Sequence, residues 1–323
     1  MTTQHIAIIG AGIAGLSCAT TLQQAGHSVQ LFDKSRGVGG RLSTRRSELW
    51  QCDHGAQYFT AKDAAFRQQV SDWLETGIAA LWEPEIKVYT AGIWTAVQGS
   101  VQRYVGTPGM SAPMRALATP LKVQTSTTIE QLTHTPDGWQ LSSAEHGLLV
   151  QNFSQVVIAV PPLQATAILG ENSNPLKAVA QSIVMQPCWT VMMQFNVPLA
   201  LPFEAAFINT GPLSWVARNS SKPARSGLET WVMHATPAWT QAHLEQTAQE
   251  AGPELIQAFQ TLGGRAPETW SAHRWRYASS ETNIDLASVW DPQAGLGLCG
   301  DWLNGGRVEG GWLSGRSLAE KML

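Results

Sequence analysis

Two glycine-rich segments near the start of the chain have the composition of phosphate-binding loops. The first, Gly10-Ala11-Gly12-Ile13-Ala14-Gly15, has the pattern GxGxxG between an apolar run and apolar residues at helical spacing. Gly10 allows a tight turn, Gly12 lets a pyrophosphate approach the backbone, and Gly15 permits close packing of helix on strand. Asp33 follows Gly15 by 18 residues, where a carboxylate can accept both hydroxyls of a ribose. A glycine-rich structural turn is the alternative, but the position of Asp33 favours dinucleotide binding.

The second loop, Arg36-Gly37-Val38-Gly39-Gly40-Arg41, carries a guanidinium group at each end. Its backbone amides and a bidentate arginine can bind the same pyrophosphate. A plain NAD dehydrogenase has no need of such a loop, which points to a different dinucleotide. A solvated basic turn is the alternative, and the loop alone does not decide between the two.

The elements that would hold these loops form a βαβ unit. Ile6–Ile9 and Ser28–Phe32 read as strands, and the apolar residues from Ile13 to Leu22 indicate a helix that ends at Gly26. Further elements of this type, two strands and a last helix, are expected at Val156–Val160, Gly295–Gly300 and about Ser314–Met322. Dinucleotide-type segments therefore occur at the start, in the middle and at the end of the chain.

The segments between these pieces have a different character. Ala64–Leu81 is expected to be an amphipathic helix, and the residues of its apolar side are Phe66, Val70, Trp73 and Leu74. Val184–Phe195 and Glu229–His234 favour strands of a mixed or antiparallel sheet, and Gln241–Leu262 favours a helix.

These patterns together predict an α/β protein with two domains. A Rossmann-type nucleotide-binding domain would be assembled from three sequence pieces, with an α+β substrate domain of mixed sheet inserted in two. The predicted ranges are 1–63, 105–170 and 284–323 for the first domain, and 64–104 and 171–283 for the second.

The composition narrows the class of protein. Hydrophobic residues make up 44% of the 323 residues and charged residues 14%, which excludes disorder for lack of apolar content. A net charge of -3 gives no electrostatic reason to expect nucleic acid or an anionic membrane as a partner. Cys18, Cys52, Cys188 and Cys299 form no CxxC pair, which favours a reducing compartment. Without a secretory signal pattern or an apolar run of membrane length, we expect a cytoplasmic protein.

Together, the motifs resemble the flavin-containing amine oxidase superfamily. Besides the two loops, the resemblance rests on Asp33-Lys34, on Asp53-His54-Gly55-Ala56-Gln57-Tyr58-Phe59, on Cys299-Gly300-Asp301 and on residues 307–315, which read RVEGGWLSG. Within the superfamily, the compact length, the Asp-x-Gly-Ala-Gln-Tyr segment and Pro187-Cys188-Trp189 are most similar to the renalases, especially bacterial ones. The resemblance implies a Rossmann-type FAD-binding domain and FAD held without a covalent link.

The resemblance also implies roles for particular residues. Ala56 and Gln57 would lie along the isoalloxazine, and Val123 would meet the adenine through its backbone. Asp301 would bind a ribityl hydroxyl or approach the pyrophosphate, although an ordinary helix cap is the alternative. Amides at Gly310 to Trp312 would stabilise negative charge on the reduced ring. The predicted cofactor-binding residues are Gly10, Gly12, Ala14, Gly15, Asp33, Lys34, Arg36, Gly39, Gly40, Arg41, Ala56, Gln57, Val123, Asp301, Gly310, Gly311 and Trp312.

The candidate pocket residues are Tyr58, His234 and Trp275. In the run from His273 to Tyr277, strand alternation would send the aromatic side chains to one face and the two arginines to the other. A cross-strand aromatic ladder beside exposed charges explains this run equally well. The histidines have no mutual ligand spacing and no HExxH occurs, so we expect no metal.

The similarity to renalases implies a hydride-transferring oxidase. A 2- or 6-dihydro isomer of NAD(P) would give a hydride to flavin N5 and leave as NAD(P)+, and oxygen would then be reduced to hydrogen peroxide. Such a substrate becomes aromatic on losing hydride and needs no strong base, and the chain shows no convincing one. The nearest alternative is an amine oxidase, which would usually place a lysine near the flavin. A polyene or porphyrinogen dehydrogenase and a non-catalytic flavin-binding sensor are further alternatives.

Overall fold

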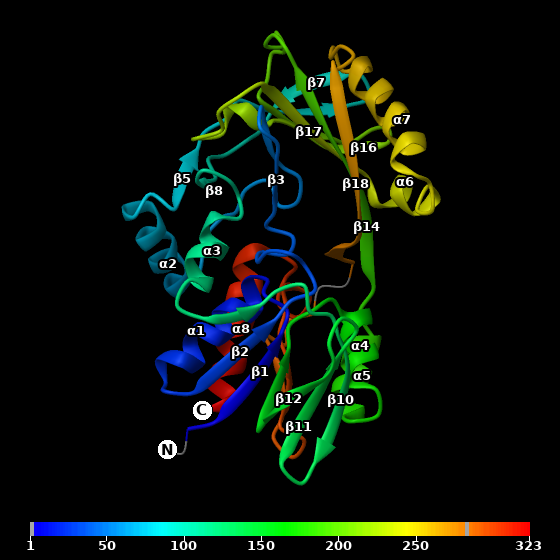
Figure 1. Ribbon diagram of the computed structural model, residues 1–323. Coiled ribbons are helices and arrows are strands. Elements are labelled where there is room, and N and C mark those ends of the chain that lie inside the picture. The colour runs from blue at the N-terminus through cyan, green and yellow to red at the C-terminus, as the bar shows by residue number, and fades with distance from the viewer. Residues whose placement is uncertain (1–2, 282–283) are drawn as a thin grey trace.

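The first βαβ unit forms where the glycine spacing predicts it. The computed structural model describes residues 3–281 and 284–323, and it begins with β1 (His5–Ile9), α1 (Ile13–Gln24) and β2 (Ser28–Phe32). β1 and β2 pair in parallel, and α1 ends at Ala25 before Gly26, whose φ is 90°. The predicted strands, helix and glycine end are therefore confirmed (Figure 1).

This unit is the centre of a six-stranded sheet. The strand order is β19-β20-β13-β1-β2-β9, parallel except for the antiparallel edge strand β19. β13 and β20 confirm the two later strands of this type. The added strands are β9 (Lys122–Gln124), β13 (Gln155–Ile158), β19 (Val289–Asp291) and β20 (Leu296–Leu298).

Both faces of the six-stranded sheet are covered, as its apolar strands require. Ile6 and Ile8 of β1 pack with α1 and the C-terminal helix α8 (Val308–Met322), whereas Ala7 and Ile9 face a second core. That second core is closed by a three-stranded antiparallel sheet and two helices. These elements are β10 (Ile129–Thr135), β11 (Gly138–Ser143), β12 (Gly147–Phe153), α4 (Pro162–Leu169) and α5 (Asn174–Gln181).

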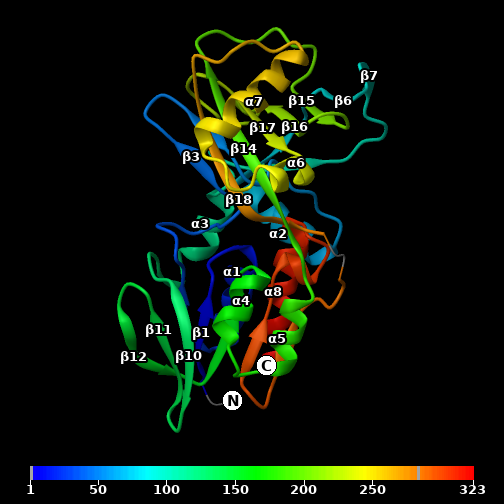
Figure 2. The same ribbon diagram turned by 90° about the vertical axis from the view of Figure 1, so that its right-hand side faces the viewer.

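A seven-stranded mixed sheet forms the other half of the molecule (Figures 1 and 2). Its order is β18-β14-β17-β16-β15-β6-β7, antiparallel except for the β15–β6 pair. The strands predicted at Val184–Phe195 and Glu229–His234 are confirmed as β14 and β17. The strands are β6 (Ile86–Thr90), β7 (Ile93–Ala96), β14 (Met185–Phe195), β15 (Ala205–Ile208), β16 (Leu213–Arg218), β17 (Glu229–Ala235) and β18 (Thr269–Ser280).

Short elements connect the two halves. The remaining strands form two small antiparallel sheets, β3 with β4 and β5 with β8. The elements are β3 (Thr44–Arg46), β4 (Gln51–Asp53), β5 (Ala79–Trp82), β8 (Arg103–Gly106), α3 (Ala112–Ala118), and the 3-10 helices η1 (Asn219–Ser221) and η2 (Asp301–Leu303).

Two predicted helices are shorter than expected. α2 (Ala64–Glu75) ends before Gly77, whose φ of 69° breaks the helix, and residues 79–82 form β5 instead. Leu74 is 38% exposed, so it does not belong to the buried side of α2. The range 241–262 contains the end of α6 (Pro237–Ala242) and then α7 (Ala248–Thr261). A capping box between Thr247 and Glu250 starts α7 separately.

The C-terminal helix begins six residues earlier than predicted. Gly310 and Gly311 precede the predicted start at Ser314, but they lie with Gly315 in α8, where the helix packs closely on its neighbours. A Cβ on Gly315 would lie 2.1 Å from the carbonyl oxygen of Ala14, and one on Gly311 2.8 Å from Ile13 Cγ2. These glycines therefore bring α8 against α1 rather than ending the helix.

The two domain ranges remain a prediction. The predicted boundary between residues 283 and 284 adjoins residues 282–283, which lie outside the described residues. Strands of the six-stranded sheet come from residues 5–32, 122–158 and 289–298. Within residues 3–281 and 284–323, no helix has the length and apolar character needed to cross a membrane.

Candidate functional site

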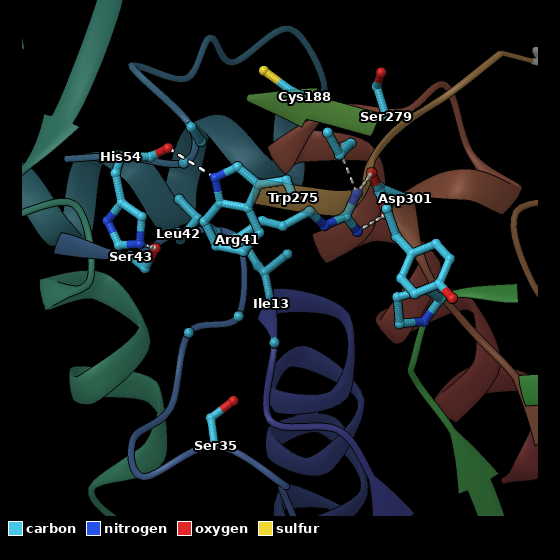
Figure 3. Close-up of a pocket in the computed structure, with 18 of the residues that line it drawn as sticks. Ile13, Ser35, Arg41, Leu42, Ser43, His54, Cys188, Trp275, Ser279 and Asp301 are labelled. Atoms are coloured by element: carbon cyan, nitrogen blue, oxygen red, sulfur yellow. Dashed lines mark hydrogen bonds and ion pairs between the residues drawn. The ribbon is translucent and has the colours of Figure 1, made fainter. Parts of the chain in front are cut away.

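A cavity of about 2070 Å³ lies where the two halves meet. Its wall includes the start of α1, residues 32–44, the segment from His54 to Thr60, and most of β18. Ligand pockets are commonly about 300–1,000 Å³. This volume therefore suits one long ligand with room for a second (Figure 3).

The three glycines of the first loop have different surroundings. A Cβ on Gly10 would lie 2.5 Å from the carbonyl oxygen of Ala159, and one on Gly15 would lie 2.0 Å from that of Gly10. A Cβ on Gly12 would meet no atom within 4 Å, and Gly12 lines the cavity. It is also the N-cap of α1 and offers the helix no side-chain acceptor. The loop thus leaves an open approach to the start of α1, which fits the pyrophosphate of FAD.

Asp33 stands at the end of β2 and lines the same cavity. Its Oδ2 accepts from the backbone N–H of Ala11 at 2.7 Å, and its Oδ1 accepts from that of Ser35 at 2.8 Å. These two hydrogen bonds hold the carboxylate beside the glycine loop. Each oxygen keeps a further lone pair for a ribose hydroxyl.

Arg41 and Asp301 meet across the cavity wall (Figure 3). Arg41 Nη1 donates to Asp301 Oδ2 at 2.9 Å and to the carbonyl oxygen of Ala278 at 3.1 Å. A second bond runs from Arg41 Nη2 to Asp301 Oδ1. The Arg41 side chain is 32% exposed and that of Asp301 10%, so the guanidinium still faces the cavity.

The structure brings most of the predicted site residues to the cavity wall and leaves others away from it. The predicted residues that line it are Gly10, Gly12, Ala14, Asp33, Lys34, Arg36, Gly39, Gly40, Arg41, Ala56, Gln57, Tyr58, His234, Trp275 and Asp301. Gly15, Val123, Gly310, Gly311 and Trp312 do not line it.

The non-lining residues have packing positions. Val123 pairs with Leu31 in the six-stranded sheet, and Trp312 packs its ring on Phe66. The part of α8 that faces the cavity is its first turn and the preceding residue, from Arg307 to Glu309. The predicted roles of these residues toward FAD stay predictions.

Trp275 lies among imidazoles on the opposite wall. Its Nε1 donates to the carbonyl oxygen of His54 at 2.9 Å, and its ring stacks on that of His54 at 5.3 Å between centroids (Figure 3). His273 contacts both rings edge-on. Arg274 and Arg276 bond to the segment from Leu244 to Gln246 instead. The opposite directions predicted for this strand are confirmed for these side chains.

Tyr58 stands at another part of the wall. The guanidinium of Arg103 lies over its ring at 5.2 Å, and Trp82 and Trp215 pack on it from behind. Trp215 itself is not among the residues that line the cavity.

A cluster of three buried charges lies behind Gln57, and the sequence did not predict it. We call Asp53, Lys222 and Arg225 the buried charge cluster; their side chains are 0%, 0% and 1% exposed. Asp53 Oδ2 accepts from Lys222 Nζ at 3.2 Å and from Arg225 Nη2 at 2.6 Å. Lys222 is 165 residues from Gln57 in the chain, and no local pattern marks it.

The cluster controls the charge state of its members. Burial alone would raise the pKa of Asp53, but the ammonium of Lys222 and the guanidinium of Arg225 outweigh it and hold that pKa at about 2. Burial lowers the pKa of Lys222, and the Asp53 carboxylate opposes that change. With one carboxylate and two cations, the cluster carries a net positive charge.

The imidazoles of the wall are neutral near pH 7. Burial, followed by the charge of Lys222, lowers the pKa of His234 to about 4. Burial, followed by His273, lowers the pKa of His54 to about 3. Burial, followed by Arg45, lowers the pKa of His273. A ligand in the cavity therefore meets uncharged rings on this side.

Two known protein families match parts of the chain. Residues 85–323 match the family described as flavin containing amine oxidoreductase, and residues 8–73 match the NAD(P)-binding Rossmann-like domain. Among curated proteins, the L-amino-acid oxidase of Siganus canaliculatus is 41% identical over 68 residues. That match covers 20% of this chain and 13% of the relative.

Solved structures of low sequence identity share the fold over nearly the whole chain. A protein designated protoporphyrinogen oxidase from Exiguobacterium sp. 255-15 has a TM-score of 0.81 at 12% identity, covering 99% of both chains. Cyclohexylamine oxidase from Brevibacterium oxydans IH-35A has a TM-score of 0.76 at 14% identity, again covering 99% of both chains. These likenesses support the two-domain α/β architecture predicted from the sequence.

Proposed function

The chain belongs to the family of flavin-containing amine oxidoreductases and is an FAD-dependent oxidoreductase, and we propose that its substrate is a 2- or 6-dihydro isomer of NAD(P). The short motif Gly55-Ala56-Gln57-Tyr58, which resembles that of the renalases, suggests this substrate. The activity would be that of a cytoplasmic oxidase that repairs misreduced NAD(P). When bound, FAD supplies a two-electron acceptor for a hydride and returns the electrons to oxygen as hydrogen peroxide.

The observation that carries the proposal is the charge of the cavity wall. The described lining residues include ten lysines and arginines but four carboxylates, although the whole chain has a net charge of -3. Two of the ten, Arg274 and Arg276, are paired with Glu245, which does not line the cavity, so eight cations remain. The pyrophosphate of FAD takes up part of this positive charge. The surplus favours a second ligand that carries phosphates, and it opposes a cationic amine.

Three of the four carboxylates of the wall already have partners and are poorly available to an ammonium group. Asp33 accepts two backbone amides, Asp301 is paired with Arg41, and Glu309 accepts from the amides of Lys62 and Asp63. The fourth carboxylate, Glu130, belongs to an exposed residue of β10. A protonated amine needs a carboxylate or an aromatic cage, and a base for its proton.

The neutral imidazoles suit the proposed reaction. A dihydropyridine loses a hydride, becomes a pyridinium cation and releases no proton from carbon, so the wall needs to hold the ring rather than deprotonate it. Neutral His234 and the indole of Trp275 can contact a flat, uncharged ring without electrostatic conflict.

Anaerobic stopped-flow mixing of the purified holoenzyme tests the proposal. We expect fast bleaching of the flavin by 6-dihydroNAD or 2-dihydroNAD, and little by benzylamine, spermidine or the ordinary 4-dihydro isomer. On admission of air, peroxide should form catalytically, which a flavin-binding sensor would not produce. Rapid reduction by an amine and none by the two isomers would establish amine oxidation instead.

The mode of FAD binding has its own test. We propose that FAD is bound without a covalent link. The test is acid denaturation of the holoenzyme followed by centrifugation. Free FAD should appear in the supernatant. Flavin that stays with the precipitated protein would contradict this part of the proposal.

A further inference from the structure

The Lys222 side chain is fully buried and does not line the cavity. Its Nζ is 3.2 Å from Asp53 Oδ2 and 3.1 Å from Gln57 Oε1, and it lies over the ring of Trp82 at 5.4 Å. A buried ammonium is costly unless each of its partners is well placed. Asp53 already has Arg225 as a partner, so the second cation is not needed to neutralise it.

The contact with Gln57 determines how the carboxamide is oriented. Lys222 can only donate, so the oxygen of Gln57 must face it. The Nε2 group is then directed to the carbonyl oxygens of Asp53 at 2.7 Å and Gly55 at 3.0 Å. Both of these are acceptors, so the orientation is consistent at all three contacts.

The same Nε2 group lies 3.4 Å from His234 Nε2. Because an amide nitrogen donates and does not accept, a proton on His234 Nε2 would point at another donor. An imidazolium carries protons on both nitrogens, so this contact disfavours it. The positive charge of Lys222 disfavours it as well.

We propose that Lys222 is a positioning residue that orients Gln57 and thereby holds His234 as a neutral imidazole in the cavity wall. The benefit of a neutral His234 for catalysis rests on the proposed hydride transfer, because the substrate gains a positive charge when a hydride leaves. This holds for a dihydropyridine, which becomes a pyridinium, and for an amine, which becomes an iminium. A charged imidazole beside that ring would oppose the reaction.

Other groups around His234 leave Lys222 as the main fixed charge near it. From the segment after β4, the carbonyl of His54 accepts a hydrogen bond that favours the protonated form. From β14, Cys188 is a neutral thiol, because burial raises its pKa to about 12. From β18, His273 is a neutral ring beside His54.

Two further charges lie beyond these neighbours. Arg45 on β3 lowers the pKa values of His54 and His273. Asp53 and Arg225 lie on the far side of Lys222 and offset each other. Removing the Lys222 charge should therefore raise the pKa of His234 without another cation replacing it.

The test is the titration of His234 by imidazole NMR in the holoenzyme, assigned with His234→Asn. In the wild-type protein, His234 should stay neutral down to about pH 5. In Lys222→Met, the midpoint should rise by about one pH unit or more toward the usual value. Lys177→Met removes a partly exposed lysine that is paired with Glu171, and it should leave the midpoint unchanged.

A second variant separates orientation from charge and covers the case in which Lys222→Met does not fold. Gln57→Met keeps the buried charge cluster but removes the directing amide, so the midpoint should rise by less than in Lys222→Met. The rate of anaerobic flavin reduction should fall on acidification with the same shifted midpoints. A His234 midpoint that is unchanged in the folded variants would overturn the proposal, whichever substrate reduces the flavin.

Discussion

The two sides of the cavity are assembled differently. The side formed by the first βαβ unit takes its lining residues from a short stretch between Ile9 and Thr44, and backbone groups and glycines dominate it. The opposite wall gathers Gln57, His234 and Trp275 from three distant segments around a buried charge cluster. The first side can serve any dinucleotide of this kind. We propose that the second side, with neutral rings and fixed charges, selects the substrate.

The largest expected effect is a loss of stability when the buried charge cluster behind the opposite wall is broken. Asp53→Asn removes the carboxylate from the buried charge cluster and leaves Lys222 and Arg225 without a counter-ion. Breaking such a buried pair costs about 3–5 kcal/mol of unfolding free energy. Denaturant unfolding measures it, with Glu171→Gln as a control because that carboxylate is 84% exposed and should change stability by less than about 0.5 kcal/mol. Equal, small effects would show that the cluster is unimportant for stability.

The same carboxylate gives a pH signature. The pKa of Asp53 in the folded protein is about 2, below its usual value of 3.8. Its contribution to stability is therefore complete above about pH 4 and is lost as the pH falls through about 2. Unfolding curves of the wild-type protein should show this loss, and those of Asp53→Asn should lack it.

A smaller effect distinguishes two glycines on the cofactor side. Gly15→Ala would place a Cβ 2.0 Å from the carbonyl oxygen of Gly10, and we expect a stability loss of about 1–3 kcal/mol. Gly12→Ala meets no protein atom, so thermal unfolding of the FAD-free protein should be unchanged while FAD retention falls. If Gly12→Ala retains FAD as the wild-type protein does, this loop does not bind the pyrophosphate.

Arg41 lines the cavity beside Asp301, and its replacement tests how the cofactor is bound. As predicted from the sequence, its guanidinium would bind the FAD pyrophosphate, with charge-assisted hydrogen bonds of about 1.5–3 kcal/mol each. Arg41→Ala should weaken FAD retention about tenfold or more. Flavin content after dialysis is the measurement, and Arg316→Ala on the surface of α8 is the control. Undiminished flavin content would leave Arg41 as only a partner of Asp301.

The smallest expected effect concerns Arg46 and Arg115 at the exposed rim of the cavity. The positive charge of each guanidinium disfavours a cation nearby. Burial, followed by the charge of Arg115, lowers the pKa of Arg46. Replacing both by alanine should reduce the rate with dilute 6-dihydroNAD several-fold, up to about tenfold, and weaken its salt dependence. Arg265→Ala, far from the lining residues, is the control. An equal loss with benzylamine would argue against a phosphate contact.

The difference between the two sides also explains what the sequence could predict. In the βαβ unit, β2 was predicted to the residue and β1 to within one residue at its start, because glycine spacing and apolar runs act locally. Tyr58, His234 and Trp275 were predicted at the pocket and do line the cavity, since the motif and strand alternation constrain them. Their catalytic roles stay predictions.

Other features depend on tertiary contacts that no local pattern reveals. The start of α8 was misplaced because its glycines are explained only by the packing of α8 on α1. The contact of Lys222 with Gln57 was not predicted, because the two residues are 165 positions apart in the chain. Val123 and Trp312 were predicted at the cofactor; they lie in a strand pair and a helix contact and do not line the cavity, and their roles toward FAD stay predictions.

The substrate class is tested most directly by a single anaerobic turnover in a mixture. Holoenzyme is mixed with 6-dihydroNAD and spermidine at equal concentrations, and both products are quantified against the flavin reduced. The surplus of cations on the wall predicts one NAD+ for each flavin reduced and no oxidised amine. Oxidised amine in proportion to the reduced flavin, with 6-dihydroNAD left intact, would contradict the account.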